Sequence, residues 1–164
     1  MRISKLSLVV LALVIGASTV QAQTNNASIT ATASVQTPIN VIGAQALDFA
    51  NVFPGVNKTV LSTNLTNAGR FDVAGQASTP VTLSFTLPAT LSSGANTMPI
   101  DTYTGISAPV STQVGGVAFN PVVGANPTLS GAGALYVWIG ARVVPATNQT
   151  AGVYTANVTM TVVY

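Results

Sequence analysis

The sequence predicts an all-β protein, an antiparallel β-sandwich that follows a cleaved signal peptide. Apolar and polar residues alternate with period two in most stretches after residue 28, which is typical of strands with one buried face. Turn-forming Gly, Pro, Asn and Ser residues separate these stretches, and several short strands between turns favour a sandwich. After the first 22 residues the sequence contains no helical pattern of normal length with caps.

Residues 1–22 have the three zones of a secretory signal. A basic start with Arg2 and Lys5 precedes an apolar run at residues 6–17, and Val20-Gln21-Ala22 offers small or modest residues to a signal peptidase. The apolar run is shorter than the about 20 residues that a membrane-spanning helix needs. We therefore predict cleavage after Ala22, export through the inner membrane, and a mature form without an integral membrane span. Its expected location is the periplasm, the cell surface or the extracellular space.

Removal of this signal would change the charge of the chain. The full sequence carries a net charge of +2, and its two surplus cations, Arg2 and Lys5, lie in the predicted signal. Residues 23–164 keep three cations and three aspartates, so their charges balance: Lys58, Arg70, Arg142, Asp48, Asp72 and Asp101. No basic patch remains, and we therefore expect no nucleic-acid partner.

The sequence contains no His, Cys or Glu. This composition excludes disulfides, imidazole or thiolate metal sites and a Ser-His-Asp triad. Asp48 and Asp101 are the carboxylates that a glycosidase-type pair would need, but Asp48 lies between apolar residues of an expected strand, where we expect it to face solvent or to pair with a base. We therefore predict that the protein is not an enzyme and that it has no metal site and no cofactor.

The alternation places the expected strands along one domain, residues 23–164, without an internal repeat. Residues 81–87 are expected to form the best central strand. Residues 135–143 are apolar on both faces and are expected to be buried on both. Residues 92–96 are expected to form a loop, and residues 104–130 long connections around a weak strand. The other expected strands are residues 29–35, 39–41, 47–49, 60–61, 71–73, 117–119 and 153–164.

The two ends of the predicted mature chain are candidate assembly strands, because an unpaired strand edge invites another strand to pair. In one type of pilus, a subunit donates an extended segment that completes the incomplete sandwich of its neighbour. Residues 25–35 suit such a donor, although the same segment would also suit the first strand of its own domain. The candidate donor-strand side chains are Ile29, Ala31, Ala33 and Val35. The candidate C-terminal assembly strand presents Tyr154, Val158, Met160, Val162 and Tyr164.

Several short motifs resemble those of a bacterial secreted family. Thr32-Ala33-Ser34-Val35, Pro38-Ile39-Asn40-Val41, Leu47-Asp48-Phe49 and Pro54-Gly55 resemble the first half of the family known as domain of unknown function 4402. The ending, from Ala151-Gly152-Val153-Tyr154-Thr155 to Tyr164, is similar to the close of that family and of the spore-coat-U-like pilins of chaperone–usher systems. The resemblance implies an immunoglobulin-like sandwich at the cell surface that serves as a pilin or an adhesive component. The spore-coat-U-like relatives usually carry cysteines, which this chain does not.

Three functions fit these features, and the first is favoured. It is a secreted structural subunit of a pilus or surface filament (a fimbrium). Such a subunit would assemble by β-strand exchange with like subunits or other pilins. A periplasmic chaperone and an usher are further expected partners. The alternative is a stand-alone secreted module that binds a carbohydrate or a surface in cell adhesion. Its ligand would stack on Tyr136 and Trp138, which core packing would otherwise explain. The third is a small outer-membrane β-barrel, because the last strand alternates and ends on Tyr164.

Overall fold

A computed structural model describes residues 23–164, and the predicted signal peptide lies outside these residues. The chain divides after Ser34, and the second unit, Val35–Tyr164, is compact and contains all the strands of the described residues. Residues 23–39 lie in no strand, and the side chains of Ile29 and Val35 are 95% and 94% exposed. The strand expected at residues 29–35 is therefore absent from the single chain, and the compact unit begins at Val35. Alternating apolar and polar residues would give a strand one apolar face, but an extended segment is stable as a strand only when it pairs with another strand.

The described residues contain no helix, and so none that is long and apolar enough to cross a membrane. Their strands pair in antiparallel fashion throughout, which confirms the all-β prediction. The strands are β1 (Asn40–Gln45), β2 (Lys58–Val60), β3 (Gly69–Ala74), β4 (Thr82–Thr86), β5 (Thr90–Ser93), β6 (Asn96–Ala108), β7 (Val117–Phe119), β8 (Ala134–Val143) and β9 (Thr159–Val163).

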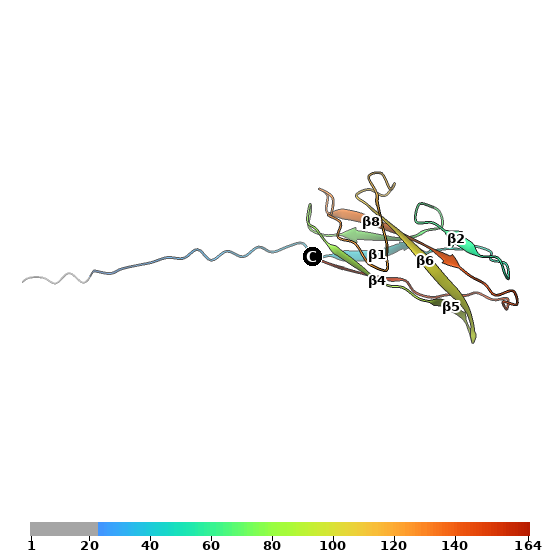
Figure 1. The fold of residues 1–164 in the computed structure, drawn as a ribbon. Helices are drawn as coiled ribbons and strands as arrows, with labels where there is room; N and C mark the ends of the chain where they lie inside the picture. The colour runs from blue at the N-terminus through green and yellow to red at the C-terminus, as the bar shows by residue number, and fades with distance from the viewer. Residues whose placement is uncertain (1–22) are drawn as a thin grey trace, which may run out of the picture. The chain divides into compact units, whose positions relative to one another are not determined.

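The larger sheet is built around β8 and has the order β1-β3-β8-β6-β5 (Figure 1). β2 pairs with the far end of β8, and β7 pairs with β6. The smaller sheet consists of β4 and β9, and isolated bridges from Leu83 to Ala125 and from Pro80 to Thr128 extend it beyond β4. The strand expected at residues 81–87 is thus confirmed as a strand, but it belongs to the smaller sheet and is not central in the larger one.

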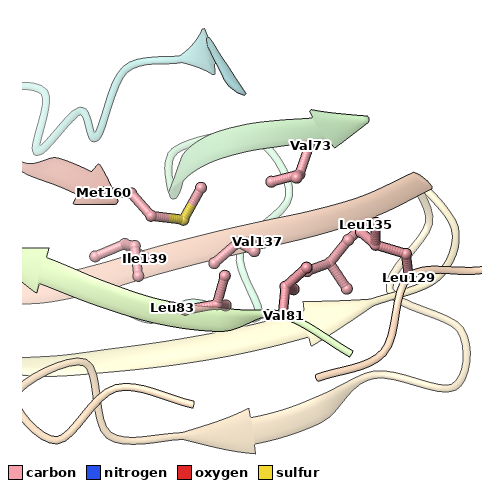
Figure 2. Close-up of a cluster of buried hydrophobic side chains, with 8 residues drawn as sticks. All are labelled: Val73, Val81, Leu83, Leu129, Leu135, Val137, Ile139 and Met160. Carbon is pink, nitrogen blue, oxygen red and sulfur yellow. The ribbon is translucent and has the colours of Figure 1, made fainter. Parts of the chain in front are cut away.

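The two sheets enclose the main hydrophobic core, which confirms the predicted sandwich. Alternate residues of β8 point toward β4 and β9, as the close-up of the core shows (Figure 2). Each side chain of this cluster is at most 7% exposed, so the period-two pattern of the sequence corresponds directly to burial. The cluster consists of Val73, Val81, Leu83, Leu129, Leu135, Val137, Ile139 and Met160.

The opposite face of β8 is also covered, as its apolar composition predicts. Trp138 is 1% exposed and packs in a cluster with Val60, Ala68 and Ala108. The chain that follows β2 passes directly over β8 at Gly140, where a Cβ atom would lie 2.3 Å from the carbonyl oxygen of Val60. Glycine at this position therefore allows the chain that follows β2 to contact the larger sheet.

The longest strand, β6, was not expected from the sequence, because a β-bulge interrupts its alternation. The register shifts between Asp101 and Thr104, and Thr102 adopts a left-handed φ of 49°. The residues that face the main core therefore have even numbers before the bulge and odd numbers after it, since Ile100 lies opposite Val143 and Gly105 lies opposite Ile139. The prediction that residues 104–130 are mainly connections is wrong for their first part, whereas the short strand at residues 117–119 is confirmed as β7.

Three further expectations need correction at strand ends. Of the loop expected at residues 92–96, only Gly94 and Ala95 form a turn, which joins the β5–β6 hairpin; Ser93 of β5 pairs with Asn96 of β6, and Gly94 has a φ of 61°. Residues 47–49 lie in no strand, because the chain leaves the larger sheet after β1. The strand expected at residues 153–164 is shorter, since only β9 pairs continuously, while Thr155 forms an isolated bridge with Ser92.

Candidate functional site

A groove of about 1000 Å³ lies between the segment that follows β1 and the segment that precedes β9. Residues 45–54 line one side of the groove, and residues 149–158 line the other. Apolar side chains of the larger sheet and of the β5–β6 hairpin also line it: Phe71, Leu91, Met98, Ile100, Ile139 and Val143. Phe71 and Leu91 are half-buried, whereas the other four side chains are at most 6% exposed, so the groove is a hollow above a core that is already largely covered.

The first wall is the segment that carries the Leu47-Asp48-Phe49 motif. The Asp48 N–H donates to the Asn67 carbonyl at 2.9 Å, and the Asp48 carboxylate accepts from the Ala50 N–H at 2.7 Å. Ala50 has a left-handed φ of 50°, so the carboxylate stabilises a local turn. Leu47 and Phe49 are half-buried, whereas Asp48 is exposed and, among residues 23–164, is the only charged residue that lines the groove.

The second wall carries the Gly152-Val153-Tyr154 motif. The Tyr154 hydroxyl donates to the Thr150 carbonyl at 2.7 Å and accepts from the Gln149 side-chain amide at 2.7 Å. A Cβ atom on Gly152 would lie 2.7 Å from the Ser93 hydroxyl oxygen, so glycine allows the close approach to β5 without a shift of the Ser93 side chain. The two motifs, which are about 100 residues apart in the sequence, therefore line the same groove.

Within the described part of the chain, β9 pairs with β4 alone and leaves its other edge open. Leu83 of β4 exchanges both backbone hydrogen bonds with Ala125, at 2.8 and 3.2 Å, on the side away from β9. Leu83 lies opposite Val162, and antiparallel bonds alternate along a strand pair. The N–H and C=O groups of Val162 and Met160 therefore point away from β4, toward the open edge.

The same residues also face the core. Met160 is 7% exposed and Val158 and Val162 are half-buried against the main cluster, whereas Thr159 and Thr161 are exposed. In an antiparallel pair, directly opposite residues have their side chains on the same face. A strand that pairs with this edge would therefore project every second side chain toward the core and the others toward solvent.

The structure separates the predicted site residues into three groups. The candidate donor residues Ile29, Ala31, Ala33 and Val35 are exposed and unpaired in the single chain. Alternation at the end of the chain is confirmed: Met160 is buried, and Tyr154, Val158 and Val162 are half-buried, while Tyr164 is 44% exposed.

The third group contains the candidate stacking residues. Trp138 is 1% exposed, which leaves no ring face for a ligand, so its predicted stacking role is wrong and its interpretation as a core residue is confirmed. Tyr136 is half-buried, and its ring centroid lies 6.2 Å from that of Trp138 in a tilted arrangement. Both rings lie on the outer face of the larger sheet.

Two ion pairs account for most of the charge in residues 23–164. Arg142 bonds Asp101 at 2.9 Å, and Arg70 bonds Asp72 at 2.8 Å. The bond from Arg142 lowers the pKa of Asp101, and the same bond raises the pKa of Arg142. None of these four residues lines the groove.

Sequence reasoning missed the floor of the groove, because Met98 and Ile100 belong to the unpredicted strand β6 and Leu91 to β5. The alternation of Met98 and Ile100 was a signal for a strand, but Pro99 and the bulge obscured it.

Among residues 23–164 no group of three acidic, His or Cys side chains is placed to hold a metal ion. A comparison of the sequence with known family models and with curated proteins finds no match.

Proposed function

We propose that this protein is an exported structural subunit of a pilus or surface filament, and that its copies assemble by β-strand exchange. Residues 23–35 of one copy would pair with the open edge of β9 in the next copy and cover its groove. The observation that carries the proposal is the open edge of β9 beside an apolar groove, in a chain that also contains an unpaired alternating segment.

The chemistry of the two surfaces is complementary. Residues 23–35 carry no charge, and Asp48 is the only charged residue that lines the groove. In a paired strand, Ile29 and Val35 would lie on the same face as the small side chains of Ala31 and Ala33, so that large side chains would fill the ends of a docking site and small ones its centre. Burial of an exposed Ile or Val side chain contributes about 1.5–3 kcal/mol.

The partners and the location form part of the same proposal. Like subunits or other pilins would supply the donor segment. An open, partly apolar edge invites unwanted pairing, so we also propose that a periplasmic chaperone covers it and that an usher exchanges this chaperone for the donor. The signal-like residues 1–22 support export through the inner membrane, to the periplasm and then the cell surface.

The first test removes the proposed donor. The mature chain and a variant that lacks residues 23–35 are purified from the periplasm, and each is examined by negative-stain electron microscopy and size-exclusion chromatography. We expect filaments from the mature chain and folded monomers from the variant, because the only residue of the compact unit that the deletion removes is Val35, which is 94% exposed. Filaments of unchanged number and length from the shortened chain would rule out a donor role.

A matched pair of substitutions tests the docking face. Ile29→Asp would place a carboxylate toward the groove, whereas Thr30→Asp would place the same charge on the opposite, solvent-facing side. We expect the first substitution to abolish filaments and the second to leave them in place. Equal loss in both variants would show that charge anywhere in the segment prevents assembly, and would contradict the assigned face.

A further inference from the structure

A group of hydrogen bonds joins the start of the compact unit to the residue that follows β9. The Tyr164 hydroxyl accepts a hydrogen bond from the Gln76 N–H at 2.7 Å and donates one to the Thr37 carbonyl oxygen. The Thr37 N–H and hydroxyl both donate to the Gln76 side-chain oxygen, at 3.2 and 3.1 Å. Thr37, Gln76 and Tyr164 therefore form a closed set of bonds, which we call the Thr37 anchor.

The packing around this anchor leaves room for the tyrosine hydroxyl. A Cβ atom on Gly75 would lie 2.7 Å from that hydroxyl oxygen and 3.0 Å from a methyl carbon of Leu129. The φ of Gly75 is not positive, so the backbone itself does not require glycine here. Glycine at this position therefore leaves the Tyr164 hydroxyl in place, whereas a Cβ atom would displace it.

The anchor also marks a boundary in the chain. Both backbone polar groups of Thr37 are hydrogen-bonded, whereas Val35, two residues earlier, is 94% exposed. Pairing within the larger sheet begins only at Asn40, opposite Ala74. Thr37 is thus held to the end of β9 before the chain enters β1.

We propose that Tyr164 is a positioning residue that ties the root of the donor segment to the acceptor strand of the same subunit. This inference rests on the proposed strand exchange. In a filament, the neighbour's donor would pull on β9, and the subunit's own donor would pull on Thr37. The anchor connects these two points directly, so that tension passes between them. Without it, tension on the donor would act directly on β1 and on its hydrogen bonds with β3.

The anchor itself is tested on the full mature chain by hydrogen exchange of backbone amides. Tyr164→Phe keeps the ring and removes the hydroxyl, so we expect the Thr37 and Gln76 amides to exchange about threefold to tenfold faster, as for the loss of one or two hydrogen bonds. Tyr154→Phe, which removes the hydroxyl at the groove wall, is the matched control and should leave both amides unchanged. Unchanged exchange in Tyr164→Phe would overturn the proposal.

The role under tension is tested on filaments by single-molecule stretching. We expect Tyr164→Phe to form filaments as readily as the parent chain and to extend or rupture at clearly lower force. Tyr103→Phe removes a hydrogen-bonded hydroxyl from a residue that does not line the groove, and its filaments should match those of the parent. Equal rupture forces for Tyr164→Phe and the parent would overturn the tension role. If the parent chain forms no filaments, the proposed function fails and the tension role with it, and the hydrogen-exchange result still decides whether the anchor exists.

Discussion

Trp138 shows how a single residue holds the outer face of the larger sheet. Its side chain is 1% exposed among Val60, Ala68 and Ala108, and the chain after β2 covers it. The Gln45 side-chain amide helps to hold this cover, because it donates to the carbonyl oxygen of Ala68 at 2.7 Å and to two neighbouring carbonyls. The aromatic residue that most invited a ligand-binding role is thus a packing residue.

We expect Trp138→Ala to lower the free energy of unfolding by about 3–5 kcal/mol, because it leaves a large cavity in a closed cluster. Urea denaturation followed by circular dichroism measures this loss. Tyr136→Ala is the control on the same face, and its cost should be smaller because Tyr136 is only half-buried. A loss below about 1 kcal/mol for Trp138→Ala would contradict its place in the core.

A pH dependence is expected from Tyr103. Burial raises the pKa of Tyr103 to about 12, with a smaller contribution from the charge of Asp101, and its hydroxyl donates to the Pro88 carbonyl at 2.7 Å. Because the folded pKa exceeds the unfolded value of 10.0, the stabilisation is fully present below about pH 10 and is lost as the pH rises through 12. Tyr103→Phe should therefore show a shallower fall of its urea midpoint over this range. Parallel curves for the two proteins would contradict this expectation.

At the scale of the element, β9 is a strand with two different edges. One edge is bonded to β4, and the other has no partner strand within the described residues. The backbone groups that point to the open edge belong to the residues whose side chains face the core, such as Met160 and Val162. A partner strand on this edge would therefore both form hydrogen bonds and extend the core.

Proline scanning of β9 separates folding from assembly, because proline lacks the N–H group. Val162→Pro removes an N–H that points to the open edge, so we expect a folded monomer that assembles poorly. Thr161→Pro removes an N–H that points to Ser84 in β4, so it should lower monomer stability by about 1–3 kcal/mol. Circular dichroism and filament yield measure the two effects. The reverse pattern would show that the edges of β9 have been assigned the wrong way round.

At the scale of the whole molecule, the balance of charge is the main feature. Two ion pairs, Arg70 with Asp72 and Arg142 with Asp101, take up most of the charged side chains of residues 23–164. Both pairs are partly exposed and contribute little to stability. The surfaces proposed to meet in a filament are almost uncharged.

We therefore expect assembly that depends little on ionic strength. The rate of filament formation, followed by light scattering, should change by less than about twofold between about 50 and 500 mM NaCl, because there are few charge interactions for salt to screen. Asp48→Lys, at the edge of the groove, is a suitable control for the sensitivity of the measurement to charge. A tenfold change with salt in the parent chain would instead indicate an electrostatic interface.

Much of the fold could be predicted from residue patterns within short stretches. The apolar residues of β8 predicted burial on both faces, and the alternation before Tyr164 predicted which side chains share a face with Met160. Because the sequence contains no His, Cys or Glu, it excluded disulfides, imidazole or thiolate metal sites and a Ser-His-Asp triad. These conclusions hold because side-chain direction along a strand depends on local geometry alone.

Other features depended on contacts between distant parts of the chain, and only the tertiary structure decided them. The bulge at Thr102 reverses the alternation of β6 and hides its length from the sequence. The groove forms because the segments that carry Phe49 and Tyr154 both line it, although these residues lie about 100 positions apart in the sequence. Above all, alternation cannot reveal which strand lacks a neighbour. A strand edge is open or paired according to where the rest of the chain lies, and this is why the open edge of β9 and the Thr37 anchor beside it became visible only in the folded molecule.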